Sequence, residues 1–99
     1  MADFQILMSK SSSGDILVIG NYRSGNEPVF VERVVIEEMD SSGDAVFGSS
    51  HHVHRSIDPR PGGYLLVSKR PSGSRIKSAR AKAYYIEIEE IAESDTLNL

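Results

Sequence analysis

The sequence of 99 residues contains no cysteine and no tryptophan. Without cysteine, the protein can form no disulfide framework, no thiolate zinc site and no cysteine nucleophile. No apolar run approaches the roughly 20 residues that a membrane-spanning helix needs, and the N-terminal residues lack the basic region and apolar stretch of a secretory signal peptide. We therefore expect a cytoplasmic protein with no membrane span, and export by a non-classical route is the alternative.

The sequence motifs of common enzymes are absent as well. The chain has no Gly-x-Ser-x-Gly nucleophile elbow, no Gly-x-x-x-x-Gly-Lys phosphate loop and no dinucleotide-binding fingerprint. The adjacent carboxylates of Glu37 and Glu38 would point to opposite faces of a strand, so they cannot share a substrate. The sequence therefore predicts a protein that is not an enzyme and has no catalytic residues.

The composition that remains is that of one folded domain. Hydrophobic residues make up 39% of the chain and charged residues 25%, which favours folding over disorder. A chain of this length buries roughly 65% of the surface that its unfolded form exposes, enough for a single core. We expect one domain over residues 1–92 and a polar, poorly ordered tail over residues 93–99.

Short segments of alternating or apolar residues, separated by turn residues, predict β-strands throughout this domain. The first two segments, residues 4–8 and 16–19, flank a Ser-rich turn and predict a hairpin; further strands are expected at residues 29–39, 45–57, 64–67 and 75–91. We predict an all-β fold, an antiparallel β-sandwich of about six to seven strands that is immunoglobulin-like or jelly-roll-like. A small barrel is the alternative.

Three of these strands carry a local uncertainty. Residues 29–39 follow Pro28 and could form a helix, although five β-branched residues in eleven favour a strand. Residues 45–57 are expected to be interrupted near residues 48–50. In residues 75–91 the alternation changes phase, which predicts a bulge or a sheet-switching bend near Tyr84 and Tyr85.

The charges are strongly segregated along the chain. Residues 1–54 hold eight acidic side chains against three basic ones, and residues 83–99 hold five acidic side chains with no Lys or Arg. Residues 55–82 have only Asp58 as an acid, against eight basic side chains: Arg55, Arg60, Lys69, Arg70, Arg75, Lys77, Arg80 and Lys82. This central basic segment is the most unusual property of the sequence.

The basic segment predicts a surface for a partner. Our leading hypothesis is a non-enzymatic interaction or self-assembly module that binds an acidic protein partner, or a second copy, through these eight residues. The turn between Lys69 and Arg75 could also hold a phosphate. Nucleic-acid binding is a second alternative, with Tyr64, Tyr84 and Tyr85 available for base stacking. A solvated edge strand that Lys and Arg protect from aggregation explains the same residues without a ligand.

All three histidines lie in the sequence His51-His52-Val53-His54. On a strand, His52 and His54 project from the same face, so their imidazoles could share a divalent transition metal ion such as zinc, nickel or copper. A third ligand, Asp58 or a carboxylate on a neighbouring strand, would be required. A metal-binding β-protein is therefore the first alternative function, and a solvated histidine-rich strand without a cofactor is the plainer explanation.

Overall fold

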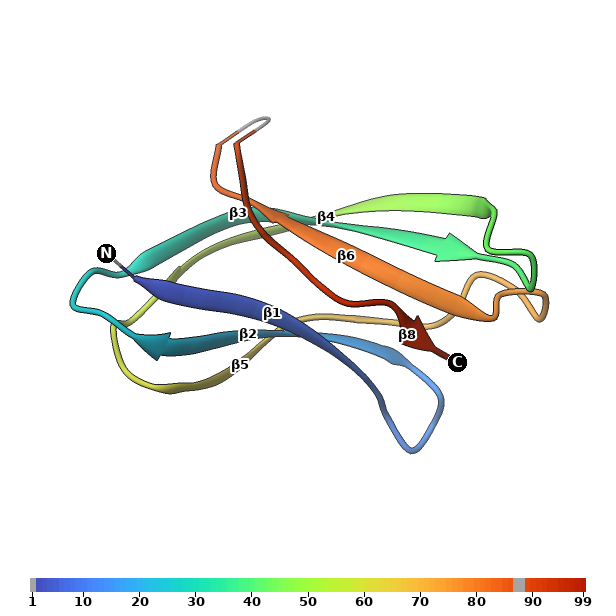
Figure 1. The fold of residues 1–99 in the computed structure, drawn as a ribbon, viewed down its shortest axis with the longest axis horizontal. Helices are drawn as coiled ribbons and strands as arrows, with labels where there is room; N and C mark the ends of the chain where they lie inside the picture. Colours follow the sequence, from blue (N-terminus) through green and yellow to red (C-terminus); the bar gives the residue numbers. More distant parts are fainter. Residues whose placement is uncertain (1, 87–88) are drawn as a thin grey trace.

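The computed structural model describes residues 2–86 and 89–99, which form two antiparallel β-sheets packed face to face (Figure 1). These residues contain no helix, and so none that could cross a membrane. The strands are β1 (Asp3–Lys10), β2 (Ile16–Ser24), β3 (Val29–Met39), β4 (Ala45–Ile57), β5 (Gly62–Lys69), β6 (Ser78–Tyr84), β7 (Glu90–Glu93) and β8 (Leu97–Asn98). The predicted antiparallel β-sandwich is confirmed, with two sheets in place of a closed barrel.

The smaller sheet has the strand order β1-β2-β5. The predicted hairpin is present, because β1 and β2 pair through a turn in which Gly14 adopts a φ of 88°, a value that glycine tolerates best. On the other side of β2, Val18 pairs with Val67 while Ile19 pairs with Leu65, so that Leu66 is an extra residue in β5. This bulge interrupts the outer edge of β5.

The larger sheet has the order β4-β3-β6-β7, with β8 also pairing with β6. Its centre is β3, which pairs with both β4 and β6. Val34 and Ile36 project from β3 into the space between the sheets and are fully buried. The β-strand prediction for residues 29–39 is therefore confirmed and the helix alternative is wrong, since β-branched side chains fit a pleated, buried surface.

The core lies between the two sheets and is built from alternate residues of most strands. At one point the backbone of β2 comes so close to the ring of Phe4 that a Cβ atom on Gly20 would lie 2.9 Å from Phe4 Cζ. The buried apolar side chains are Ile6, Ile16, Val18, Tyr22, Val31, Val34, Ile36, Met39, Ile57, Val67, Ile76, Ala79, Ala81 and Ala83.

Two strands differ from the sequence-based predictions. The expected interruption near residues 48–50 is wrong: β4 is continuous, because Ser49 and Ser50 remain paired with Ile36 and Val35 of β3. Residues 75–91 do not form one bent strand. Instead β6 ends at Tyr84, after a register shift, and β7 pairs antiparallel with it. Beyond the paired residues, the Tyr85 N–H donates a hydrogen bond to the Glu89 carbonyl. Ile88, part of the expected phase change, lies outside the described residues.

The C-terminal residues also differ from the expected polar tail. Leu97 and Leu99 are half-buried and pack against the core, and the Leu99 N–H donates a hydrogen bond to the Lys77 carbonyl. Ser94 is buried, and its hydroxyl accepts a hydrogen bond of 2.8 Å from the Ala81 N–H. Residues 93–99 are thus held by the larger sheet, because their few apolar side chains alternate with the polar ones.

Candidate functional site

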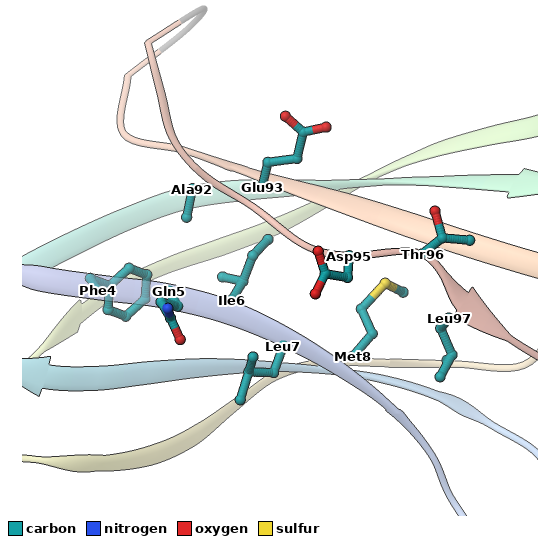
Figure 2. Close-up of a pocket in the computed structure, with 10 residues that line it drawn as sticks. All are labelled: Phe4, Gln5, Ile6, Leu7, Met8, Ala92, Glu93, Asp95, Thr96 and Leu97. Atoms are coloured by element: carbon teal, nitrogen blue, oxygen red, sulfur yellow. The ribbon is translucent and has the colours of Figure 1, made fainter.

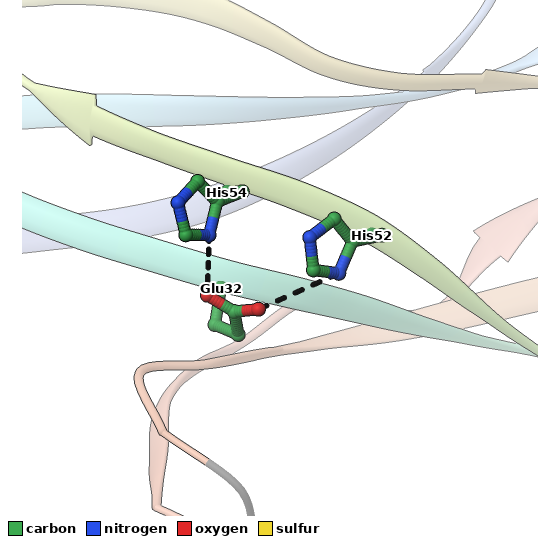
Figure 3. A group of neighbouring side chains, drawn as sticks. All are labelled: Glu32, His52 and His54. Carbon is green, nitrogen blue, oxygen red and sulfur yellow. Dashed lines mark hydrogen bonds and ion pairs between the residues drawn. The ribbon is translucent and has the colours of Figure 1, made fainter.

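The side chains of Glu32, His52 and His54 meet on the outer face of the larger sheet (Figure 3). The pairing of β3 with β4 explains how. Val31 pairs with Arg55 and Arg33 with His52, so that Glu32 alone faces both Val53 and His54. His52 and His54 project from the same face of β4, and this β-bulge places the single carboxylate between them (Figure 3).

The carboxylate of Glu32 contacts both imidazoles. The Nδ1–H of His54 donates a hydrogen bond of 2.9 Å to one oxygen, and Nδ1 of His52 lies 3.4 Å from the other. The two rings are stacked, with centroids 5.5 Å apart and an angle of 9° between their planes. Glu32 is 26% exposed, whereas His52 and His54 are 72% and 66% exposed, so solvent reaches the site directly.

The backbone of His54 is held in an unusual conformation. Its φ of 48° is the only positive value of a non-glycine residue in the described chain, and such a conformation costs of order 1 kcal/mol or more. The Phe30 ring and the imidazole of His54 also meet in a T-shaped contact, with centroids 5.2 Å apart. Backbone and packing therefore both fix the direction of this side chain.

The three side chains match the requirements of a transition metal ion. Each can bring one ligand atom, and the three atoms lie within 4.8 Å of one another. In a tetrahedral zinc site with bonds of about 2.0–2.1 Å, neighbouring ligand atoms are about 3.3 Å apart. Small rotations of the three side chains would bring their ligand atoms to this spacing. Glu32 thus fills the place of the third ligand expected on a neighbouring strand, while Asp58 instead pairs with Arg60.

No protein-family model matches the chain, and neither do any of the curated proteins or solved structures. The candidate site therefore rests on its own geometry.

The third histidine, His51, is separated from this site. It pairs with Val34, so its side chain turns toward the other sheet, where Nε2 lies 2.8 Å from the Ser49 hydroxyl. Burial of the imidazole and the nearby Lys69 cation lower the pKa of His51, although the Glu38 carboxylate opposes them. The histidine cluster in the sequence is thus divided between two faces of β4.

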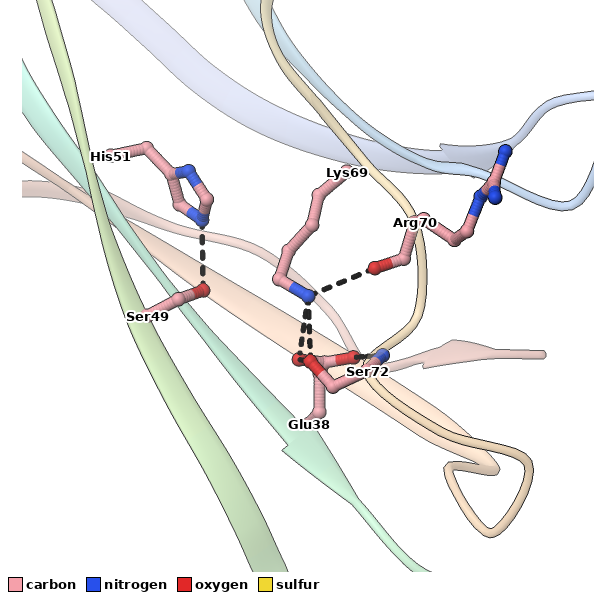
Figure 4. A network of polar contacts seen from close by, with 6 residues as sticks. All are labelled: Glu38, Ser49, His51, Lys69, Arg70 and Ser72. Carbon is pink, nitrogen blue, oxygen red and sulfur yellow. Dashed lines mark hydrogen bonds and ion pairs between the residues drawn. The ribbon is translucent and has the colours of Figure 1, made fainter.

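A second polar group, which the sequence analysis did not predict, joins the two sheets at one end of the sandwich (Figure 4). The carboxylate of Glu38 is 0% exposed and accepts hydrogen bonds from the Ser72 N–H at 2.8 Å and the Ser72 hydroxyl at 2.6 Å. The Lys69 ammonium group, 17% exposed, lies 3.0 Å from the same carboxylate. The turn that we considered for phosphate therefore already binds a carboxylate of its own chain.

These contacts decide the charge of Glu38. Burial alone would raise its pKa, but the two hydrogen bonds from Ser72 and the Lys69 ammonium group outweigh burial and hold the pKa of Glu38 below its ordinary value. The carboxylate is therefore ionised inside the sandwich and linked to the smaller sheet through Lys69, the last residue of β5. A buried ion pair of this kind stabilises the fold only while both partners are present.

The structure does not gather the eight basic residues into one surface. Their contacts lie on different strands and loops: Arg55 with the Leu65 carbonyl and the Tyr64 ring, Arg60 with Asp58, Lys69 with Glu38, Arg70 with Asp15, Arg75 over Phe47, Lys77 with the Ser74 carbonyl, Arg80 with Glu37, and Lys82 with Glu90. Several of these charges are thus compensated by acids on other strands or turns of the same chain. Glu87 of the acidic segment lies outside the described residues.

The three tyrosines proposed for base stacking have different neighbours. Tyr64 is on β5 beside Arg55, the Arg33 guanidinium lies over the Tyr84 ring at 4.1 Å, and the rings of Tyr85 and Phe30 meet edge to face. Each ring is thus in contact with a different side chain of its own chain, which disfavours a common stacking platform of the kind found in single-strand binding proteins.

Proposed function

We propose that this protein is a non-enzymatic metal-binding β-domain, in which Glu32, His52 and His54 hold one divalent transition metal ion. The carboxylate placed between two stacked imidazoles on paired strands is the observation that carries this proposal. Two imidazoles and one carboxylate suit zinc, copper and nickel better than calcium or magnesium, which prefer oxygen ligands.

The three ligands leave the coordination incomplete. Because both imidazoles are largely exposed, water or a donor group of another molecule would take the remaining position. Binding should also depend on pH, since an imidazole must be neutral to coordinate a metal. We therefore expect the affinity to fall when the solution is acidified.

Calorimetry with zinc, copper and nickel salts tests the proposal. The native protein should bind one ion per chain, and Glu32→Gln, His52→Ala and His54→Ala should each weaken binding by roughly tenfold or more. The matched control is His51→Ala, which removes the neighbouring imidazole on the other face of β4 and should leave the affinity unchanged.

Cobalt provides a second measurement, because its visible absorption reports the number and kind of ligands. A tetrahedral spectrum in the native protein that disappears in His54→Ala is expected. The proposal fails if none of the three metals produces binding heat, or if His51→Ala reduces the affinity as much as the ligand variants do.

A further inference from the structure

Strand β1 forms an edge of the smaller sheet, and its outer side has no strand partner among the residues that the structure describes. Opposite this edge run β7 and β8, at the edge of the larger sheet. Figure 2 shows the two segments separated by a groove, with residues 4–8 on one side and residues 92–97 on the other. The sandwich is therefore open along this side.

The groove is apolar at its base. Its volume is about 360 Å³, within the range of about 300–1,000 Å³ common for ligand clefts. Phe4, Ile6 and Met8 of β1 point toward the facing sheet, and Ala92 and Leu97 line the opposite wall (Figure 2). Alternate apolar side chains along an unpaired edge are the surface that an added β-strand covers.

The other long edge strands are protected against such pairing, whereas β1 is not. The edge of β4 carries the bulge opposite Glu32, and β5 carries the bulge at Leu66; bulges of this kind disrupt strand addition. The only irregularity in β1 falls at its first residues, between Asp3 and Phe4, and its only lysine, Lys10, is its last residue.

The rim of the groove is acidic. Asp95 is exposed and lines the groove, and within the described part of the chain its side chain makes neither an ion pair nor a hydrogen bond. Glu93 also belongs to this wall, but it pairs with Lys82 and its carboxylate points away from β1 (Figure 2). A carboxylate without a cation beside an apolar groove favours a ligand that carries a positive charge at the same end.

We propose that the groove between β1 and residues 92–97 binds an extended peptide segment of another protein by strand addition. The segment pairs with the outer edge of β1, inserts apolar side chains at alternate positions between Phe4 and Met8, and presents lysine or arginine to Asp95. A second copy of this chain fits less well, since pairing of β1 with its counterpart would bring the acidic rims of two copies together.

A synthetic peptide with the sequence Lys-Thr-Val-Thr-Val-Thr-Lys, blocked at both ends, is a direct probe. Its lysines and valines share one face, and at about 3.3 Å per residue it nearly matches the length of β1. Titration into isotopically labelled protein, with chelator present, should shift the amide resonances of residues 4–8 and 92–97 and leave those of β4 unchanged. A peptide with proline in place of the central threonine should not bind, because it lacks the N–H group needed for pairing.

Charge reversal tests the rim. Asp95→Lys should weaken binding of the lysine peptide by roughly three- to tenfold and favour the peptide that has glutamate in place of lysine. The matched control reverses one exposed acid outside the groove, Asp44→Lys, and should leave binding unchanged.

Three outcomes overturn the proposal. They are peptide-induced shifts confined to strands other than β1, equal binding of the lysine and glutamate peptides, and self-association through β1 in the absence of peptide. The last result would identify a second copy as the occupant of the groove.

Discussion

Removal of either partner of the buried Glu38–Lys69 pair should destabilise the fold far more than removal of both. Glu38→Leu leaves the Lys69 ammonium group 17% exposed and without its carboxylate, and breaking a buried pair in this way costs about 3–5 kcal/mol. Lys69→Met costs less, about 1–3 kcal/mol, because the N–H and hydroxyl of Ser72 still stabilise the buried carboxylate.

The double variant separates the pair from the packing around it. When Glu38→Leu and Lys69→Met are combined, two apolar side chains of similar size replace the ion pair, and such replacements are often close to neutral. We therefore expect a coupling of at least about 2 kcal/mol between the two substitutions. Because domains of this size unfold with only about 5–15 kcal/mol, Glu38→Leu alone should remove a substantial part of the stability.

Urea denaturation of the native protein, the two single variants and the double variant measures these differences in unfolding free energy. The dependence of the unfolding free energy on urea concentration should be the same in all four. Arg80→Met is the matched control, since Arg80 also pairs with a carboxylate of β3, Glu37, but on the exposed outer face; it should cost no more than about 1 kcal/mol. Additive effects of the two substitutions, or equal costs for Lys69→Met and Arg80→Met, would refute the reasoning.

The buried Glu38–Lys69 pair also predicts that the stability of the fold depends on pH. Folding lowers the pKa of Glu38, so the unfolded chain binds this proton more readily than the folded one. The stability that Glu38 contributes is therefore present above the ordinary carboxyl pKa of about 4.3 and is lost as the pH falls through the lower pKa of the folded state. The unfolding free energy of the native protein should therefore fall more steeply below about pH 4.3 than that of the double variant, which has no Glu38 to protonate. Urea denaturation at several acidic pH values measures the two slopes, and equal slopes would contradict the linkage.

Three further predictions concern single side chains. Because burial lowers the pKa of His51, its contribution to stability is present above about pH 6.5 and lost as the pH falls through its folded pKa; the unfolding free energy of His51→Gln should vary less between pH 7 and pH 5. Tyr22→Phe removes the hydrogen bond of 2.6 Å from the phenol to the Glu27 carbonyl and should cost about 1 kcal/mol in urea denaturation. Gly20→Ala places a methyl group against the Phe4 ring and should lower stability by about 1–3 kcal/mol, whereas an unchanged midpoint would show that the ring moves aside freely.

Much of the fold could be predicted from local patterns, because alternation and turn residues act over a few positions. The β-branched residues of β3 and the turn residues after it predict a hairpin with β4, and a regular count back from the pair Met39–Ala45 would place Glu32 opposite His52. The structure instead has two register shifts in this hairpin, one between Glu38 and Met39 and one between Val31 and Arg33. Together they bring Glu32 between His52 and His54, and no sequence pattern locates them.

The ionic contacts were harder to predict than the strands. Glu38 follows Glu37 in the sequence and resembles it, yet one carboxylate is buried between the sheets and the other faces solvent beside Arg80. The partner of Glu38 is Ser72, which lies two strands later in the chain. The segregation of charge along the sequence likewise does not predict which acid pairs with which base, because antiparallel strands bring together residues that are distant in the sequence.

The order of the strands has a consequence for the kinetics of folding. Strands β3 and β4 form a hairpin of neighbouring segments, whereas β5 can join β2, and β6 can join β3, only after long loops have closed, which slows folding. Glu32, His52 and His54 all lie in the early, local hairpin. If that hairpin is formed in the folding transition state, a bound metal ion will accelerate folding and leave the unfolding rate nearly unchanged.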